Sequence, residues 1–339
     1  MSTLQATNLK NAASASNNIV LDTSGNATFA GTAAMSSSFL RNRIINGGFD
    51  VWQRGTSTST NLAYLADRWI VASASGSITG SQSSDVPSSA FRFSLSASGT
   101  NTPQTLQRIE SVNCLGLVGQ SVTVSFWVKQ TSGAGTNSMG VQILFPTTTD
   151  NYAAVTGITT NLITATSSWT YVTTTFSSLP AAAANGVQLL IYATTAGSAA
   201  FLVTGVQLEV GTAATPFERR QFGQELALCQ RYAYAWGPGQ QYVAAYSTGL
   251  YFDPSQITMI PYGINTSGMR SLSATITAFG TQGTDWLVQT AGGVNQTGFT
   301  LNWAAGVLFV VKAGHGITSG NCNLQVVSSN GRIVVATEL

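Results

Sequence analysis

Charged side chains are scarce in this chain of 339 residues. Lysine and arginine contribute 14 residues and aspartate and glutamate 12, so charged residues make up only 8% of the sequence. No run of basic residues occurs, and the chain therefore lacks the phosphate-neutralising surface of nucleic-acid-binding proteins. We expect no nucleic-acid partner.

Long apolar runs are absent as well. No stretch approaches the roughly 20 apolar residues that cross a bilayer, and the first residues lack the basic and apolar segments of a signal peptide. These absences predict a protein that neither inserts into a membrane nor is exported by a signal peptide.

Cysteine and histidine are too few and too scattered to suggest a reactive centre. Cys114, Cys229 and Cys322 have no Cys-x-x-Cys spacing, so we interpret them as buried small side chains. The single histidine, His315, lies among glycines, and no Gly-x-Ser-x-Gly motif accompanies it. We expect no catalytic residue and no cofactor.

Glycine, with 34 residues, and abundant serine, threonine and asparagine take the place of the lysine and glutamate that surface helices prefer. Such a composition favours strands and turns. We predict an all-β fold in four parts: an extended stalk at residues 1–42, a jelly-roll β-sandwich at 43–213, a short linking α-helix at 214–236 and a smaller β-sandwich at 237–339.

The stalk segment contains few large apolar side chains and cannot bury enough surface to offset its chain entropy. Within it, residues 19–21 and 27–30 have the character of two short strands on either side of a Ser-Gly-Asn turn. A hairpin this small is marginal in isolation, so we expect other copies of the chain to cover it.

Short runs with a period of two mark the predicted jelly roll. In the clearest run, Val122, Val124, Phe126 and Val128 share one face, and Trp127 lies on the other. Similar runs follow at the spacing that is typical of a sandwich or jelly roll.

The one helical pattern begins with Thr215, Pro216 and Glu218, which match a capping box, and its main part is expected at residues 224–235. Four apolar side chains on or beside one face are candidate contacts on a trimer axis: Leu226, Leu228, Tyr232 and Trp236. Packing of this face within its own chain remains the alternative. Beyond it, Asn330-Gly331 lies between β-branched runs and predicts a hairpin in the second sandwich.

Aromatic side chains on a weakly charged surface suit sugars, because a ring covers the apolar face of a sugar while amides and hydroxyls bond its hydroxyl groups. The candidates are Trp127, Trp52, Trp69, Trp286, Trp303, Tyr246 and Tyr251. Trp127 is the first of them because it lies on the polar face of its strand. Each ring has a structural alternative, which is packing in a core or against another subunit.

The stretch RIINGGFDVWQRG, residues 43–55, is unusually rich in charge for this chain. We interpret its charged residues, together with Asp67 and Arg68, as groups that tie loops to strands by charge-assisted hydrogen bonds. The second interpretation is a structural calcium ion held in part by Asp50 or Glu209, which needs several further oxygen ligands.

Six stretches carry a family resemblance in the order NRIINGGFDVWQRGTS, ADRW, QRIE, SFWVK, SWTYVTTTF and VQLEVGTAATPFERRQFGQELALCQRY. Over residues 42–232 this set resembles a module of bacteriophage and prophage tail fibre proteins. NGGFD and VQLE are also similar to the opening and closing strands of jelly-roll carbohydrate-binding modules. The resemblance implies a virion component, usually trimeric, that displays β-sandwich domains toward the host surface.

On this resemblance we expect a structural tail fibre protein that binds a host cell-surface glycan as a homotrimer and is not an enzyme. It would be assembled in the host cytoplasm, attach to other tail or baseplate proteins through its N-terminal stalk, and present the last sandwich as a receptor-binding tip. Two alternatives remain open: a polysaccharide depolymerase, and a baseplate or head fibre component without a receptor role.

Overall fold

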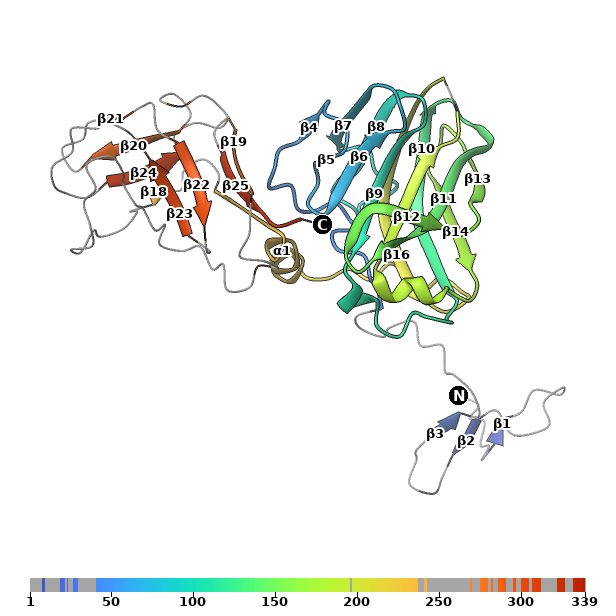
Figure 1. Cartoon of the computed structure of the whole chain (residues 1–339). Helices are drawn as coiled ribbons and strands as arrows, with labels where there is room; N and C mark the ends of the chain where they lie inside the picture. The colour runs from blue at the N-terminus through green and yellow to red at the C-terminus, as the bar shows by residue number, and fades with distance from the viewer. Residues whose placement is uncertain are drawn as a thin grey trace, which may run out of the picture. The chain divides into compact units, whose positions relative to one another are not determined.

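The chain forms two units, Met1–Leu40 and Arg41–Leu339 (Figure 1). The computed structural model describes residues 8–9, 19–21, 23, 27–29, 41–195, 197–236, 241–242, 269, 275–279, 282, 286–290, 295–296, 300–304, 307–311, 322–326 and 332–338.

The smaller unit contains one antiparallel sheet of three short strands, β1 (Asn8–Leu9), β2 (Ile19–Leu21) and β3 (Ala27–Phe29). Strand β2 lies between the other two, with Ile19 opposite Leu9 on one side and Phe29 on the other. The two predicted strands are confirmed, and β1 was not foreseen because two residues show no alternation.

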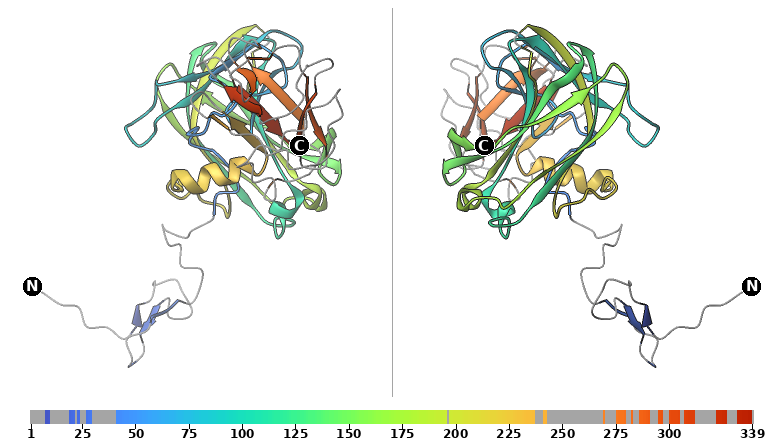
Figure 2. Two further views of the ribbon diagram at one scale, coloured as in Figure 1. Left: turned by 90° about the vertical axis from the view of Figure 1, so that its left-hand side faces the viewer. Right: turned by 90° about the vertical axis from the view of Figure 1, so that its right-hand side faces the viewer.

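The larger unit begins with a sandwich of two antiparallel sheets (Figures 1 and 2). Sheet I has the strand order β14-β10-β16-β8-β7-β4, and sheet II has the order β12-β11-β15-β9-β6-β5, with β13 also paired to β11. The predicted jelly roll is confirmed.

Sheet I is made of β4 (Ser57–Thr58), β7 (Ile78–Ser83), β8 (Ser94–Thr100), β10 (Val122–Ser132), β14 (Thr170–Phe176) and β16 (Ser198–Val210). Sheet II is made of β5 (Ala63–Tyr64), β6 (Trp69–Ser73), β9 (Pro103–Ile109), β11 (Gly135–Thr148), β12 (Asn151–Gly157), β13 (Asn161–Ala165) and β15 (Val187–Ala193). Two short 3₁₀ helices, η1 (Ser111–Cys114) and η2 (Ala181–Asn185), connect strands.

The core lies between the two sheets, and alternation along the strands fills it. In β10 the four apolar residues of the predicted face, Val122 to Val128, are fully buried, and β15 contributes Val187, Leu189 and Ile191 from the opposite sheet. Because every second residue of a strand points the same way, the remaining residues of β10 and β15 form the outer faces of the sandwich.

The helix differs from its prediction. Helix α1 spans Phe222–Gln230, and the chain then forms strand β17 (Ala233–Trp236), so residues 231–235 are not helical. The predicted capping box is also wrong, because the backbone N–H and the hydroxyl of Thr215 both donate to Glu209, at 2.7 Å each. Glu218 instead accepts a hydrogen bond from the backbone N–H of Asn42, at 2.8 Å.

The C-terminal region continues in strands, as predicted. They are β17, β18 (Gln241–Tyr242), β19 (Thr275–Phe279), β20 (Trp286–Thr290), β21 (Asn295–Gln296), β22 (Thr300–Ala304), β23 (Val307–Val311), β24 (Cys322–Val326) and β25 (Arg332–Ala336). They pair in the orders β17-β25-β19, β18-β24-β20-β21 and β22-β23. The hairpin predicted at Asn330-Gly331 is wrong, because the strands on either side of it, β24 and β25, belong to different sheets.

Candidate functional site

The charge-rich opening stretch runs along strand β16 and closes the sandwich. The backbone N–H of Val206 donates to the carbonyl oxygen of Gly47 at 2.9 Å. The backbone N–H of Arg43 donates to the carbonyl oxygen of Leu208, also at 2.9 Å. A Cβ atom at position 47 would lie 2.1 Å from the carbonyl oxygen of Val206, so this close approach requires glycine.

Buried polar groups fix this stretch to helix α1. The backbone N–H of Asn46 donates to Glu225 Oε1 at 2.5 Å, and Arg220 Nη1 donates to the carbonyl oxygen of Ile44 at 3.0 Å. Arg220 Nη2 also donates to the carbonyl oxygen of Asn42. Arg220 and Glu225, which follow the sandwich in the sequence, therefore hold the opening stretch in place.

A second buried network joins residues 53–68 to the last described residues. Arg54 contacts Asp67 Oδ1 at 3.3 Å and Glu338 Oε1 at 2.7 Å, and Arg68 pairs with the other oxygen of Glu338. The Arg68 guanidinium lies 3.5 Å from the ring centroid of Tyr232. Burial raises the pKa of the Asp67 carboxyl to about 6, against the opposing effect of Arg54.

The Tyr232 hydroxyl completes this network by donating to Glu110 Oε2 at 2.8 Å, and Arg231 Nη2 lies 3.0 Å from the same oxygen. Tyr232 is 1% exposed, so its side chain contacts its own chain and is not available on a helix face. Leu226 and Leu228 are half-buried on α1, and the side chain of Trp236 lies outside the described residues.

The two calcium candidates have protein donors as partners. Arg219 Nη2 donates to both oxygens of Asp50, at 3.1 and 3.0 Å, and Glu209 accepts from Thr215 and from Gln207 Nε2. Among the described residues, no three His, Cys, Asp or Glu side chains gather as metal ligands. Both carboxylates therefore act as hydrogen-bond acceptors that fix the strand ends and the segment after the sandwich.

The outer face of sheet I carries an aromatic pair, and we call this surface the aromatic face. Trp127 on β10 lies directly opposite Tyr171 on β14, with ring centroids 5.2 Å apart and ring planes inclined by 49°. Trp127 is half-buried, and Tyr171 is 40% exposed. The prediction that Trp127 points away from the core is confirmed by the register of β10.

A third aromatic side chain extends this row. Trp169, just before β14, donates from Nε1 to Asp85 Oδ1 at 2.8 Å, and Lys129 Nζ contacts Asp85 Oδ2 at 2.6 Å. These two hydrogen bonds lower the pKa of Asp85, the one from Lys129 most. Asp85 thus holds the indole of Trp169 in one orientation beside the Trp127–Tyr171 pair.

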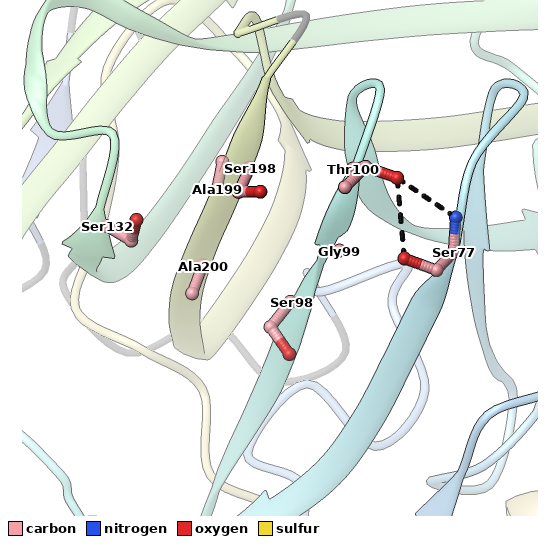
Figure 3. A pocket seen from close by; sticks show the side chains of 8 residues that line it. All are labelled: Ser77, Ser98, Gly99, Thr100, Ser132, Ser198, Ala199 and Ala200. Atoms are coloured by element: carbon pink, nitrogen blue, oxygen red, sulfur yellow. Dashed lines mark hydrogen bonds between the residues drawn. The ribbon is translucent and has the colours of Figure 1, made fainter.

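Farther along the same sheet, a hollow of about 280 Å³ is lined by small side chains, as Figure 3 shows. The lining residues are Ser77, Ser98, Gly99, Thr100, Ser132, Ser198, Ala199 and Ala200. The Thr100 hydroxyl accepts a hydrogen bond from the Ser77 backbone N–H at 3.1 Å. The volume of the hollow lies just below the range of roughly 300–1,000 Å³ that is typical of ligand pockets.

The outer face of sheet II has a different chemistry, and we call it the amide face. The strand register places the side chains of Gln104, Arg108, Gln142, Gln188 and Tyr192 on it. The Tyr192 ring lies against Gly140, where a Cβ atom would be 2.5 Å from the ring. Arg108 Nε donates to Gln188 Oε1 at 3.2 Å, so part of this face is already paired within the chain.

The remaining aromatic side chains that the sequence suggested as sugar-binding platforms have different positions in the structure. Trp69 is fully buried and donates from Nε1 to the carbonyl oxygen of Asn46 at 3.0 Å, so its prediction as a surface platform is wrong. Trp52 is half-buried and packs against the core. The other candidates fall outside what the structure describes, either as whole residues or as side chains: Trp286, Trp303, Tyr246 and Tyr251.

Sequence reasoning missed Tyr171 and Asp85. Tyr171 was detectable, because it is two residues from Trp169 in an alternating run and therefore shares its face. Asp85 was not, because its contacts with Lys129 and Trp169 join distant parts of the chain.

Three further predictions concern the cysteines, the single histidine and membrane-spanning segments. Burial raises the pKa of the Cys114 thiol to about 12, and Cys229 is a second buried free cysteine. His315 lies outside the described residues. Within the described part of the chain, no helix combines the length and the apolar character of a membrane span.

Residues 42–197 match the family model described as a carbohydrate binding domain. No curated protein matches the chain. Among solved structures, the chain is similar to the enzymatically active domain of tailspike protein 4 of bacteriophage CBA120, with 17% identity over 50% of this chain and 21% of that one, at a TM-score of 0.34.

Two carbohydrate-binding modules are also similar in structure. The CBM22-1 xylan-binding domain of Paenibacillus barcinonensis Xyn10C shows 15% identity over 47% of this chain and 94% of that one, at a TM-score of 0.33. A family 11 module of Clostridium thermocellum in complex with a mixed-linked tetrasaccharide shows 14% identity over 47% and 96%, at a TM-score of 0.29. The sandwich is thus a jelly roll similar to that of carbohydrate-binding modules.

Proposed function

We propose that the chain is a structural tail fibre protein of a tailed bacteriophage, and that it binds host surface glycans through the aromatic face. One observation carries the binding proposal: within a region that matches a carbohydrate-binding family, the half-buried Trp127 and the exposed Tyr171 pair on the outer face of a sheet.

The chemistry of this face suits a sugar. Aromatic rings offer flat apolar area with little loss of side-chain entropy, and Trp169 keeps its indole fixed through Asp85. Toward the hollow, strand β10 runs five residues from Trp127 to Ser132, which is about 17 Å at a rise of about 3.4 Å per residue. A glycan chain that stacks on the rings can extend toward the hydroxyl groups of the hollow.

The fibre role rests on the resemblance of the ordered motifs and on the charge-poor, hydroxyl-rich composition. A fibre that carries several copies of a weak site gains avidity, so each site needs only modest affinity. Attachment to tail or baseplate proteins through the stalk, and a location in the virion, belong to the same proposal. Labelling of purified virions with an antibody against the chain tests that location, and unlabelled virions would contradict it.

Binding is tested by titrating the full-length protein with polysaccharide fragments from the host surface in a calorimeter. Trp127→Ala and Tyr171→Ala are each expected to weaken binding roughly fivefold, as the loss of one stacked ring is worth about 1 kcal/mol. Gln142→Ala on the amide face is the control and is expected to leave the affinity unchanged.

The outcomes separate function from location. If the wild-type protein binds no fragment, glycan binding is overturned. If it binds and only Gln142→Ala weakens the affinity, the function stands but the aromatic face is the wrong surface. New reducing ends after overnight incubation with the polysaccharide would replace the adhesive function with a depolymerase.

A further inference from the structure

Exposed large apolar side chains are rare among the described residues, and most of them gather in one place. Nine are exposed, and five of these belong to three segments that contact residues 42–44, at the start of the larger unit. We call these five the junction patch: Val112, Leu115, Val118, Val210 and Phe222.

Hydrogen bonds place one side of the patch beside the start of the unit. The Arg43 side chain donates from Nη1 to the carbonyl oxygen of Asn113, at 3.4 Å, which brings the loop of Val112, Leu115 and Val118 next to it. The backbone N–H of Arg43 donates to the carbonyl oxygen of Leu208, two residues before Val210.

The other side of the patch is the beginning of α1. Arg220 donates to the carbonyl oxygens of Asn42 and Ile44, and Phe222 follows two residues later with 56% of its surface exposed. Figure 2 shows α1, in gold, at the end of the sandwich where the chain enters it.

Exposure of these side chains needs a physical reason. Leu115 is 72% exposed and Val112 is 56% exposed, although the rest of the surface is rich in serine and threonine. Contiguous apolar patches on soluble proteins usually mark an interface, because water contact with them is unfavourable. Something is therefore expected to cover the junction patch.

We infer that the junction patch is a contact surface between copies of this chain. The first 40 residues form a separate unit with strands of two or three residues, too small for a core of its own. If these segments assemble with one another, they tether the larger units of the several copies through Arg41, the first residue of each unit. The surface around Arg41 is then the part of the larger unit that a neighbouring copy reaches most readily, and the apolar side chains belong to the segments beside it.

This placement differs from the helix face predicted from the sequence. It uses Phe222 at the start of α1 and the loop after η1, and it does not use Tyr232, which is buried in its own chain. It is also independent of what the aromatic face binds.

The test is the mass of the full-length protein by sedimentation over a range of dilutions. The wild type is expected to contain several chains. Leu115→Asp is expected to weaken association by roughly a hundredfold, because each interface would bury an unpaired carboxylate. Since Leu115 is 72% exposed, this change leaves the core untouched; Val118→Asp, at 45% exposure, is the second variant.

Leu62→Asp is the matched control, because Leu62 is 62% exposed but lies next to β5, and its mass is expected to equal that of the wild type. A wild-type monomer would overturn the inference. So would an assembly whose mass survives both patch substitutions, provided that circular dichroism shows the variants folded.

Discussion

Residues 42–68 and the aromatic face use polar chemistry in opposite ways. In the first region the side chains of Arg54, Asp67 and Arg68 are buried and form ion pairs inside the chain. On the aromatic face one ion pair, Lys129 with Asp85, lies at the surface, and hydroxyl groups dominate the rest. The scarce charge of this chain thus fixes its interior connections, and uncharged groups form the surface.

The difference separates structural from functional interpretation of a motif. Residues of the family resemblance hold the end of β16 and the segment before α1 in place through Glu209 and Asp50, and Asn46 binds α1 through Glu225. The residues proposed to bind sugar lie outside that network, on strands whose inner faces form the core. Substitutions in the two regions should therefore differ in kind: loss of folding stability in one, and loss of binding with little loss of stability in the other.

The largest expected effect is that of Arg68→Met. Arg68 is 1% exposed, pairs with Glu338, donates to the carbonyl oxygen of Arg108 and covers the Tyr232 ring. Breaking a buried pair by removing one partner costs about 3–5 kcal/mol, and we expect a loss of that size in the free energy of unfolding, measured with urea.

Arg92→Met is the control for that loss. Arg92 is exposed and lies over the Phe93 ring at 4.9 Å, so its substitution is expected to cost less than about 1 kcal/mol. Equal effects of the two substitutions would show that the burial and pairing of Arg68 are not the cause of the loss.

Gly47→Ala is expected to come next, at about 2–3 kcal/mol. The new Cβ would lie 2.1 Å from the carbonyl oxygen of Val206, so the opening stretch must move away from β16 and lose its hydrogen bond there. Gly223→Ala in α1 is the control, because no atom lies within 4 Å of a Cβ atom there. It should stabilise the protein slightly. A harmless Gly47→Ala would show that the opening stretch is not held as closely as its contacts indicate.

Asp67 predicts a dependence on pH. Its folded-state pKa is raised to about 6 by burial, above about 3.9 in the unfolded chain. Between these values the folded protein binds a proton that the unfolded chain has lost, so this group's contribution to stability falls as the pH rises through about 6. Urea unfolding should show the wild type losing about 2 kcal/mol more than Asp67→Asn between pH 4.5 and 7.5. Parallel pH profiles of the two proteins would refute this assignment.

The sandwich was predictable because the alternation of apolar and polar residues within each strand shows which side chains are buried. In β10 the alternation of Val122 to Val128 fixes which residues are buried, whatever the partner strands are. The end of the helix was not predictable in this way. Tyr232 continues the helical spacing, but Ala233 pairs with Ala336, about a hundred residues later, and this pairing turns the segment into a strand.

The site was predictable to the same extent. The alternation along β10 placed Trp127 on the outer face correctly. Trp69 is the first residue of its strand and follows a turn, so the sequence ADRW did not show whether its side chain points into the core. Thr215 binds Glu209, six residues earlier, and not Glu218, three residues later. Which of the two carboxylates Thr215 binds depends on how the segment after β16 folds back. Polar residues that join distant segments carry no periodic signal.

The smallest expected effect on stability belongs to Asp85→Asn. The side chain of Asp85 is 43% exposed and that of Lys129 is 25% exposed, so removing this pair should change the free energy of unfolding by less than about 1 kcal/mol. Its effect on binding should be larger, because Trp169 would lose a charge-assisted hydrogen bond that fixes its indole. The fluorescence anisotropy of the tryptophans, excited at the red edge of their absorption, measures how firmly the indole is held. Titration with the glycan measures the effect on binding. Lys129→Met, which leaves the bond from Trp169 to Asp85 in place, is the matched control and should weaken binding less. If Asp85→Asn destabilises the fold as strongly as Arg68→Met, then charge on the aromatic face is structural too, and the contrast between the two regions fails.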